Sequence, residues 1–476
     1  MRLVSWLFFY MKIEDLKNKK ITVMGLGLHG GGVAIAKFLC ANGAVVTVTD
    51  IKSKEELAPS IEKLKNCKNI TFVFNAHRPE DFTKVDMIIK NPAAPWTNKY
   101  VKMALDAGIP VESDSSLFFK FTKNEIIGVT GTKGKTTTAT LIYEILKAAG
   151  KSVMKVGIGQ VSVLDKIPEL KKDTIVVFEL SSWRLSALGR HKLSPKVAVI
   201  TNIYPDHLNY YKTMEEYLND KKYIFKNQTS SDWCVINQDD AKLDILEPEI
   251  KSQIIKFSKQ KINSGKTVYA ADGAIYLNNG IDEKKIIDVA DIKIKGAHNR
   301  ENIMAAIAAV SIYNIDPKII KKTIAEFTGV AHRLELVREL NGVKYINDTA
   351  ATTPESAIFG LNSYSEPIIL ICGGSDKNLD VAEFGAEIVR KAKGVIFLKG
   401  AATEKIIAAI KNNLPELEKF KSFSIVDSMA KAVELARLEA VSGDIVLLSP
   451  GAASFGMFQN EFDRGDKFKE AVKALK

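Results

Sequence analysis

The chain has 476 residues, of which 46% are hydrophobic and 26% are charged, and these proportions exclude disordered, collagen-like and coiled-coil proteins. At roughly 150 residues per domain, the length predicts about three domains. Lysine and arginine exceed aspartate and glutamate by 67 − 56 = 11. Because the lysines are dispersed and not interleaved with aromatic residues, we expect anionic small molecules as ligands and no nucleic acid.

Three further features bear on the location of the protein. No stretch reaches the roughly 18 to 20 apolar residues that a membrane-spanning helix needs, so we expect no membrane span. Residues 1–11 are interpreted as an extension before the first domain, either derived from an upstream start codon or serving as a short anchor. The cysteines form no C-x-x-C pair, which favours a reducing cytoplasm over a disulfide framework or a zinc site. They are Cys40, Cys67, Cys234 and Cys372.

Short apolar runs rich in β-branched residues alternate with longer segments of helical periodicity along the chain. Each run ends near Gly, Asp or Asn and precedes a helical segment, a pattern that predicts parallel sheets buried on both faces. The fold class is therefore α/β. The clearest runs are residues 20–25, 44–50, 86–90, 125–131, 174–180, 196–202, 367–374, 394–400 and 444–451.

Three strand-to-glycine-loop starts divide the chain. We expect a first domain over residues 12–121, a central domain over 122–327 and a C-terminal domain over 328–476. Within the central domain, residues 255–295 contain short alternating segments separated by Gly- and Asn-containing turns. These segments predict a small antiparallel extension of the central sheet.

A strand, a glycine loop and an amphipathic helix follow one another over residues 126–150. Such a loop turns backbone N–H groups onto phosphate oxygens at the positive end of a helix dipole. Lys135 would reach the β- and γ-phosphates, and Thr136 would offer its hydroxyl to Mg²⁺. Val129 replaces the first glycine of the G-x-x-x-x-G-K-[ST] pattern, which leaves a shorter G-x-x-G-K-T form. The predicted ATP contacts are Gly131, Thr132, Lys133, Gly134, Lys135, Thr136 and Thr137.

A second glycine loop satisfies G-x-G-x-x-G through Gly25, Gly27 and Gly30, and Asp50 ends the next apolar run. The pattern places a pyrophosphate at a helix N-terminus. NAD and a nucleotide-diphosphate sugar both present such a group, so this loop by itself leaves both ligands open.

Acidic and histidine side chains follow two apolar runs beyond the phosphate loop. Glu179 ends one run, and Asp206 and His207 lie just past another. A carboxylate at the end of a buried strand is costly without a metal ion or a cationic partner. We therefore predict that Glu179 and His207, with Thr136, are ligands of Mg²⁺.

Eight ordered motifs resemble the Mur ligase family, the ATP-dependent amide-bond formers of peptidoglycan synthesis, and the match covers nearly all of residues 12–476. They are GTKGKTTT, FELSS, NIYPDHL, EEYLNDKKYIF, GAHNRENIMAA, VAHRLELV, YINDTAATTPES and LLSPGAASFGMFQNEFDRGDKF. The resemblance implies an N-terminal Rossmann-like domain, a central P-loop ATPase-like parallel sheet and a C-terminal Rossmann-like domain. It further implies a cytoplasmic, monomeric ligase that adds D-glutamate to UDP-N-acetylmuramoyl-L-alanine through an acyl phosphate.

The resemblance also assigns roles to residues of this chain. Two Mg²⁺ ions would bind Thr136, Glu179, His207 and a carbamylated lysine, which is Lys221 or, by another count, Lys222. The nucleotide would contact Asn299 and Asn302, with Arg333 and Asp348 reaching it from the C-terminal domain. Glutamate would be held by Lys377, Ser454 and Phe455, and the UDP-sugar by Leu28, His29, Asp50 and Gln160.

Several residues depart from the family pattern, and other functions compete. Arg184 stands where a neutral amide is frequent, Ala350 where a lysine is familiar, and Glu461 at an aromatic position. The last two departures leave undetermined which residues contact the acceptor amino acid. The same scaffold could accept L-glutamate or a folate-type substrate. An NAD-dependent dehydrogenase would use the first glycine loop but leaves the phosphate loop, Glu179 and His207 without a role. A nucleotide-binding regulator would bind ATP without forming an amide.

Overall fold

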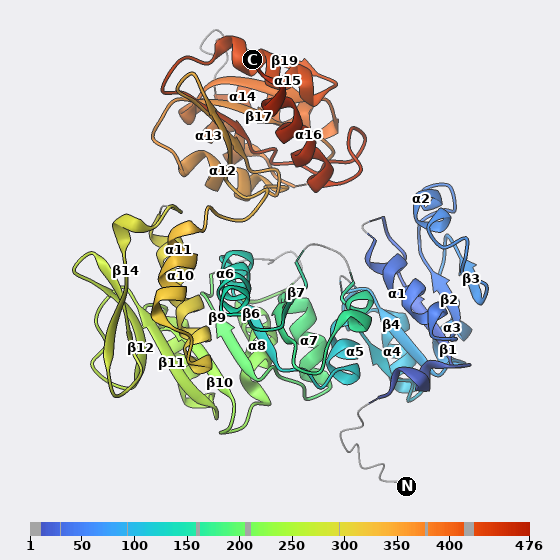
Figure 1. Cartoon of the computed structure of the whole chain (residues 1–476). Helices are drawn as coiled ribbons and strands as arrows, with labels where there is room; N and C mark the ends of the chain where they lie inside the picture. Colours follow the sequence, from blue (N-terminus) through green and yellow to red (C-terminus); the bar gives the residue numbers. More distant parts are fainter. Residues whose placement is uncertain are drawn as a thin grey trace. The chain divides into compact units, whose positions relative to one another are not determined.

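The computed structural model describes residues 11–28, 30–92, 94–158, 162–204, 211–294, 296–376, 379–413 and 423–476. The chain divides into two compact units, one ending at Phe327 and the other running from Thr328 to Lys476 (Figure 1). Both units are built from parallel sheets and helices, which confirms the predicted α/β class. Over the described ranges, no helix combines the length and apolar character needed to cross a membrane.

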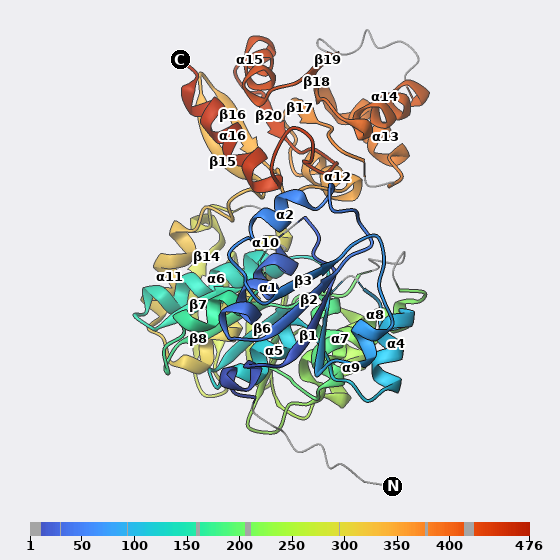
Figure 2. The same cartoon turned by 90° about the vertical axis from the view of Figure 1, so that its right-hand side faces the viewer.

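The first sheet contains five parallel strands in the order β3-β2-β1-β4-β5. Because β1 pairs with both β2 and β4, the direction in which successive strands are added to the sheet reverses beside β1. Parallel α/β sheets bind their ligands at this point. Figure 2 shows α1 near the strands of this sheet. The strands are β1 (Lys20–Met24), β2 (Val45–Thr49), β3 (Ile70–Val73), β4 (Met87–Lys90) and β5 (Val111–Glu112). The helices are η1 (Ile13–Leu16), α1 (Gly31–Ala41), α2 (Ala58–Glu62), α3 (Glu80–Thr83), α4 (Lys99–Asp106) and α5 (Asp114–Phe121).

The central sheet has nine strands in the order β14-β13-β12-β11-β10-β9-β6-β8-β7. Strand β6 (Ile126–Thr130) lies between β8 (Ile175–Glu179) and β9 (Val197–Ile200), so their carboxyl ends lie side by side. The outer strands β12 (Lys266–Ala271), β13 (Ala274–Asn278) and β14 (Glu283–Asp288) pair antiparallel, which confirms the predicted extension. The remaining strands are β7 (Val153–Val156), β10 (Trp233–Asn237) and β11 (Gln253–Ser258).

Helices of the central part connect these strands and leave their carboxyl ends open to ligands. The α-helices are α6 (Lys135–Ala148), α7 (Ser182–Arg190), α8 (Met214–Lys226), α9 (Ala241–Leu246), α10 (Ala297–Val310) and α11 (Pro317–Glu326). The short 3-10 helices are η2 (Leu164–Glu169), η3 (Glu247–Glu249), η4 (Val289–Asp291) and η5 (Ser311–Tyr313).

The C-terminal sheet has the order β15-β16-β20-β17-β18-β19, with only the β15–β16 pair antiparallel among its described strands. Alternate residues of β17 enter two different cores, one lined by α12–α14 and the other by α15 and α16. Figure 2 shows α16 beside β15 and β16. The strands are β15 (Glu335–Leu340), β16 (Val343–Asn347), β17 (Ile368–Cys372), β18 (Ala392–Leu398), β19 (Phe423–Val426) and β20 (Ile445–Leu448). The helices are α12 (Pro354–Asn362), α13 (Ala382–Lys391), α14 (Ala401–Asn413), α15 (Met429–Glu439) and α16 (Glu461–Ala474).

A buried arginine joins α16 to the loops at the ends of β16 and β20. Arg464 is 0% exposed, and its Nε donates to the Thr349 hydroxyl at 3.0 Å. Its Nη2 donates to the Thr349 carbonyl at 3.0 Å, and its Nη1 donates to the Ala452 carbonyl at 3.1 Å. Burial lowers the pKa of the guanidinium to about 9, so the group remains charged at neutral pH.

We expect Arg464→Met to lower the free energy of unfolding of the C-terminal unit by about 3 kcal/mol or more, because buried hydrogen bonds to a charged group are lost together. Urea denaturation followed by circular dichroism measures this loss. Arg390→Met is the matched control, since Arg390 is exposed, pairs with Glu387 and donates to the Asn362 Oδ1 at 3.0 Å at the surface; it should cost about 1 kcal/mol or less. Equal denaturation midpoints for the two variants would contradict the role given to Arg464.

Candidate functional site

The predicted phosphate loop joins β6 to α6, and two of its positions require glycine. Gly131 has φ +147°, and a side chain there would overlap the Thr201 hydroxyl. Gly134 has φ +85° and precedes α6, and a Cβ there would overlap the Oδ1 of Asn302. Residues with a side chain are strained at such φ values, so both the backbone and the space around it demand glycine.

Two polar residues after β9 hold this loop in shape. The Thr201 hydroxyl donates to the Lys133 carbonyl at 2.6 Å. The Asn202 Oδ1 accepts a hydrogen bond from the Lys133 N–H at 2.9 Å, and the Asn202 carbonyl accepts one from the Thr132 N–H at 2.9 Å. Sequence reasoning missed both residues, although a Thr-Asn pair directly after a buried strand was an available signal.

Two lysine ammonium groups converge on one carbonyl of the loop. The Lys135 Nζ donates to the carbonyls of Gly131 and Thr132, both at 2.9 Å. The Lys221 Nζ, on α8, donates to the same Gly131 carbonyl at 3.0 Å. The Lys135 ammonium thus brings positive charge to the loop that is predicted to bind the phosphates of ATP, and the Lys221 nitrogen lies against the same carbonyl.

The two lysines that the sequence leaves open for carbamylation lie in different surroundings. Lys221 is 2% exposed, and its Nζ lies 4.6 Å from the ring centre of Tyr217, whose hydroxyl lies 3.1 Å from the Thr132 hydroxyl. Lys222 pairs with Glu249 at 2.6 Å. Only Lys221 of this pair contacts the phosphate loop in the described structure.

The oxygen donors beside the loop fit Mg²⁺. Glu179 ends β8 and pairs in register with Val129, close to where β6 enters the loop. Its Oε2 is buried and has no hydrogen-bond partner among the described residues, and Thr136 is buried at the start of α6. A carboxylate in that position calls for a cation. Within the described ranges no group of three His, Cys, Asp or Glu residues gathers.

Two asparagines of α10 lie beside the phosphate loop. The Asn302 Nδ2 donates to the Asn299 Oδ1 at 3.3 Å. The Thr138 hydroxyl, on α6, donates to the Asn302 Oδ1 at 3.4 Å. The predicted nucleotide residues on α6 and α10 therefore belong to one cluster, in which Thr137 is part of the first turn of α6.

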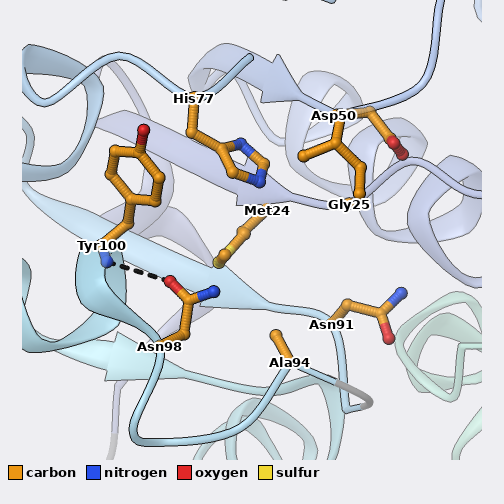
Figure 3. A pocket seen from close by; sticks show the side chains of 9 residues that line it. Met24, Gly25, Asp50, His77, Asn91, Ala94, Asn98 and Tyr100 are labelled. Carbon is orange, nitrogen blue, oxygen red and sulfur yellow. Dashed lines mark hydrogen bonds between the residues drawn. The ribbon is translucent and has the colours of Figure 1, made fainter. Parts of the chain in front are cut away.

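A pocket of 330 Å³ opens at the carboxyl ends of β1, β2 and β4, where the strand order of the first sheet reverses. In Figure 3, Asp50 and His77 lie on one side of this pocket, and Asn91, Ala94 and Asn98 on the opposite side. Its lining residues are Met24, Gly25, Asp50, Ile51, His77, Asn91, Ala94, Asn98 and Tyr100. Sequence reasoning found only Gly25 and Asp50 of this set; the Asn- and Pro-rich segment after β4 was a signal for Asn91, Ala94 and Asn98.

Asp50 shapes the first glycine loop through its carboxylate. Its Oδ2 accepts hydrogen bonds from the N–H groups of Leu26 at 2.9 Å and Gly27 at 3.0 Å. Its Oδ1 accepts one from the Lys52 N–H at 3.0 Å. Leu28 is exposed on the same loop. Burial lowers the pKa of His77, which lies on the same side of the pocket as Asp50, so its imidazole is neutral above pH 7.

Arg184 forms a buried ion pair with Asp114 at 3.3 Å, and its Nη1 donates to the Gly157 carbonyl at 2.7 Å. This cation therefore joins α7 to α5 and to the end of β7. A neutral amide could not make the ion pair, which explains the departure from the family pattern in structural terms.

The C-terminal unit holds the other predicted ligands. Asp348 accepts hydrogen bonds from the Ser449 hydroxyl at 2.8 Å and the Leu334 N–H at 3.2 Å. Burial raises its pKa to about 7, while the nearby Arg333 opposes that shift. The Ser375 hydroxyl donates to the Phe455 carbonyl, and Ser454, next to Phe455, is buried.

Four predicted ligands lie outside the described residues, namely His29, Gln160, His207 and Lys377.

We expect Gly134→Ala to weaken ATP binding about tenfold or more, because backbone strain of about 1–3 kcal/mol adds to the overlap with Asn302. Titration with a fluorescent ATP analogue measures the affinity. Gly150→Ala is the control, since Gly150 also has a positive φ, +71°, but a Cβ there would meet no other described atom within 4 Å. Unchanged affinity in Gly134→Ala would show that the loop does not bind the nucleotide.

Comparison with known proteins assigns the three sheets to one family. Residues 19–113 match the family described as "Mur ligase MurD-like, N-terminal domain". Residues 129–310 match "Mur ligase middle domain", and residues 332–451 match "Mur ligase, glutamate ligase domain".

Full-length relatives give the same result. The UDP-N-acetylmuramoylalanine–D-glutamate ligase of Roseiflexus sp. (strain RS-1) is 39% identical over 468 residues, which cover 97% of this chain and 100% of the relative. The ligase of the same name from Borreliella afzelii (strain PKo) is 39% identical over 472 residues, covering 98% and 100%.

Solved structures share the fold. The UDP-N-acetylmuramate–alanine ligase MurC of Thermotoga maritima has a TM-score of 0.56 and 22% identity, covering 96% of this chain and 100% of that chain. The MurF ligase of the same organism, solved with ADP, has a TM-score of 0.51 and 18% identity, with 97% of each chain covered. Because relatives 39% identical extend over nearly its full length, the chain belongs to the Mur ligase family.

Proposed function

We propose that the protein is a cytoplasmic, monomeric, ATP-dependent ligase that joins D-glutamate to UDP-N-acetylmuramoyl-L-alanine. The observation that carries this proposal is the phosphate loop, where Lys135 and Lys221 converge on one carbonyl beside Glu179, whose Oε2 has no hydrogen-bond partner among the described residues. The relatives named as D-glutamate ligases supply the substrate pair. The dehydrogenase alternative is set aside because the chain belongs to a ligase family.

In the first step, a carboxylate oxygen of the UDP-sugar peptide attacks the γ-phosphorus of ATP, and the bond to the leaving ADP breaks. Both reactants are anionic, so the step needs positive charge and in-line positioning. Lys135 would supply charge at the β- and γ-phosphates, and the exposed Lys133 adds a second cation. Bound Mg²⁺, held by Thr136 and Glu179 with His207 at a second ion, would neutralise the phosphate oxygens.

In the second step, the amine of glutamate attacks the acyl phosphate, and phosphate leaves as the amide forms. The loop that carries Ser454 and Phe455 would hold the glutamate, together with Lys377. The hydrogen bond from Ser375 to the Phe455 carbonyl and the contact from Arg464 to the Ala452 carbonyl fix this loop. A fixed loop reduces the entropy that would be lost when the amino acid is oriented.

The pocket of the first sheet would take the uridine diphosphate. Its site at the strand-order reversal is where parallel α/β sheets bind nucleotides. Asp50 fixes the conformation of the glycine loop by accepting hydrogen bonds from the N–H groups of Leu26 and Gly27. Asn91 and Asn98 add amide groups that suit a uracil or ribose.

Lys221 is our assignment for the carbamylated lysine. An ammonium cannot bind a metal ion, whereas the carbamate formed from its amine and CO₂, with loss of a proton, is an anion with two oxygens. The burial of Lys221 and its contact with the phosphate loop support this choice over Lys222, which pairs with Glu249.

The acceptor is tested by phosphate release from ATP in the presence of UDP-N-acetylmuramoyl-L-alanine and one amino acid at a time. We expect release with D-glutamate and a product whose mass equals both substrates joined with loss of water. Release only with L-glutamate or another amino acid would keep the ligase but change the acceptor. Absence of release with every acceptor would overturn the proposed function.

The carbamate is tested by substituting the two neighbouring lysines. We expect Lys221→Ala to lose activity by about a hundredfold or more and to regain part of it when formate or acetate occupies the vacated space. Lys222→Ala is the matched control and should stay active without added carboxylate. Rescue of Lys222→Ala instead would move the assignment by one residue.

A further inference from the structure

A buried lysine supports one wall of the first-sheet pocket, although it does not line that pocket itself. Lys90 ends β4 and is 1% exposed. Its Nζ donates to the Ala94 carbonyl at 2.8 Å, with longer contacts to the carbonyls of Asn91 at 3.3 Å and Pro92 at 3.5 Å. An ammonium has three N–H donors, so these three carbonyls use all of them.

The same segment is held a second time through Trp96. The Lys90 Nζ lies 4.8 Å from the centre of the Trp96 ring, and the Arg190 guanidinium lies 4.2 Å from it. The indole N–H donates to the Ser186 hydroxyl at 3.0 Å. Two cations and one hydrogen bond therefore fix this side chain against α7.

Two of the three carbonyls that Lys90 holds belong to residues that line the pocket. Asn91 and Ala94 line it, and the Asn91 N–H donates to the Met24 carbonyl at 2.9 Å. A Cβ at Gly25 would lie only 3.1 Å from the Asn91 Cβ, so this side chain is next to the first glycine loop. Displacement of the wall would thus move a group that lies directly beside the predicted pyrophosphate.

We propose that Lys90 is a positioning residue for the UDP-sugar: its ammonium orders the wall that begins at Asn91, so that the pocket is formed before the ligand arrives. This inference rests on the proposed function, because the UDP-sugar is the ligand assigned to the pocket. Ordering a binding wall in advance increases affinity by removing the cost of ordering it on binding.

The energetics of the buried charge agree with a positioning role. Burial lowers the pKa of Lys90 to about 8, with Arg190 on α7 acting in the same direction, while Asp220 on α8 and Asp114 on α5 oppose it. Since the folded pKa lies below the ordinary value of 10.5, protonated Lys90 opposes folding at neutral pH. This unfavourable contribution is relieved as the pH rises from about 8 towards 10.5. The charge therefore orders the wall without stabilising the fold.

The test is calorimetric titration of the full-length enzyme with UDP-N-acetylmuramoyl-L-alanine. We expect Lys90→Met to weaken binding about tenfold or more, with kcat at saturating substrate and KM for ATP nearly unchanged. Lys99→Met is the matched control, because Lys99 is exposed and lies 4.8 Å from the ring centre of the pocket residue Tyr100. It removes the same charge near the same pocket and should bind normally.

The pH dependence separates positioning from a purely structural role. Affinity of the unmodified enzyme should fall between pH 7 and pH 9 as Lys90 loses its proton, whereas Lys90→Met should show no such fall. His77 does not contribute, because it is already neutral across this range. The pH series of the unmodified enzyme tests the role of Lys90 even when Lys90→Met does not fold. An affinity for the UDP-sugar that stays constant between pH 7 and pH 9 overturns the proposal.

The outcomes also separate this inference from the proposed function. Equal affinity of Lys90→Met and Lys99→Met overturns the role of Lys90 alone, and so does an equal loss of UDP-sugar and ATP binding. An unmodified enzyme that does not bind the UDP-sugar overturns the proposed function and, with it, this inference.

Discussion

The carbonyl of Gly131 is the point on which the candidate ATP site depends. It accepts hydrogen bonds from Lys135 and Lys221, which come from different helices, and it stands where β6 turns into the loop. Its position is set by β9 on one side, through Thr201 and Asn202, and by β8 on the other. The order of three adjacent strands therefore determines where the Lys135 and Lys221 nitrogens meet.

Much of this arrangement could be predicted from the sequence, because local signals mark it. Strands β6, β8 and β20 are continuous apolar runs, and the glycines of the two loops show where the chain turns at their ends. The fold class and the antiparallel extension follow from such patterns. Family membership followed from the order of several motifs, which is far more specific than any single one.

The parts that could not be predicted are contacts between segments that are distant in sequence. Asn202 touches the phosphate loop only because β9 is inserted beside β6, and His77 and Asn91 share a pocket only because β1 lies between β2 and β4. Strand order is set by crossover connections, so no local pattern reports it. The role of Lys90 was hidden for the same reason, since a lysine at the end of a strand ordinarily points into water.

The contacts of Arg464 give α16 a part in ordering the loops of the C-terminal sheet. Thr349 and Ala452 lie in loops after β16 and β20, and a residue of α16 ties them together. A nascent chain that still lacks α16 on the ribosome has no means of fixing these loops in this way. The loop after β16 can therefore reach this arrangement only once α16, which contributes Arg464 from 115 residues further along the chain, has been synthesised.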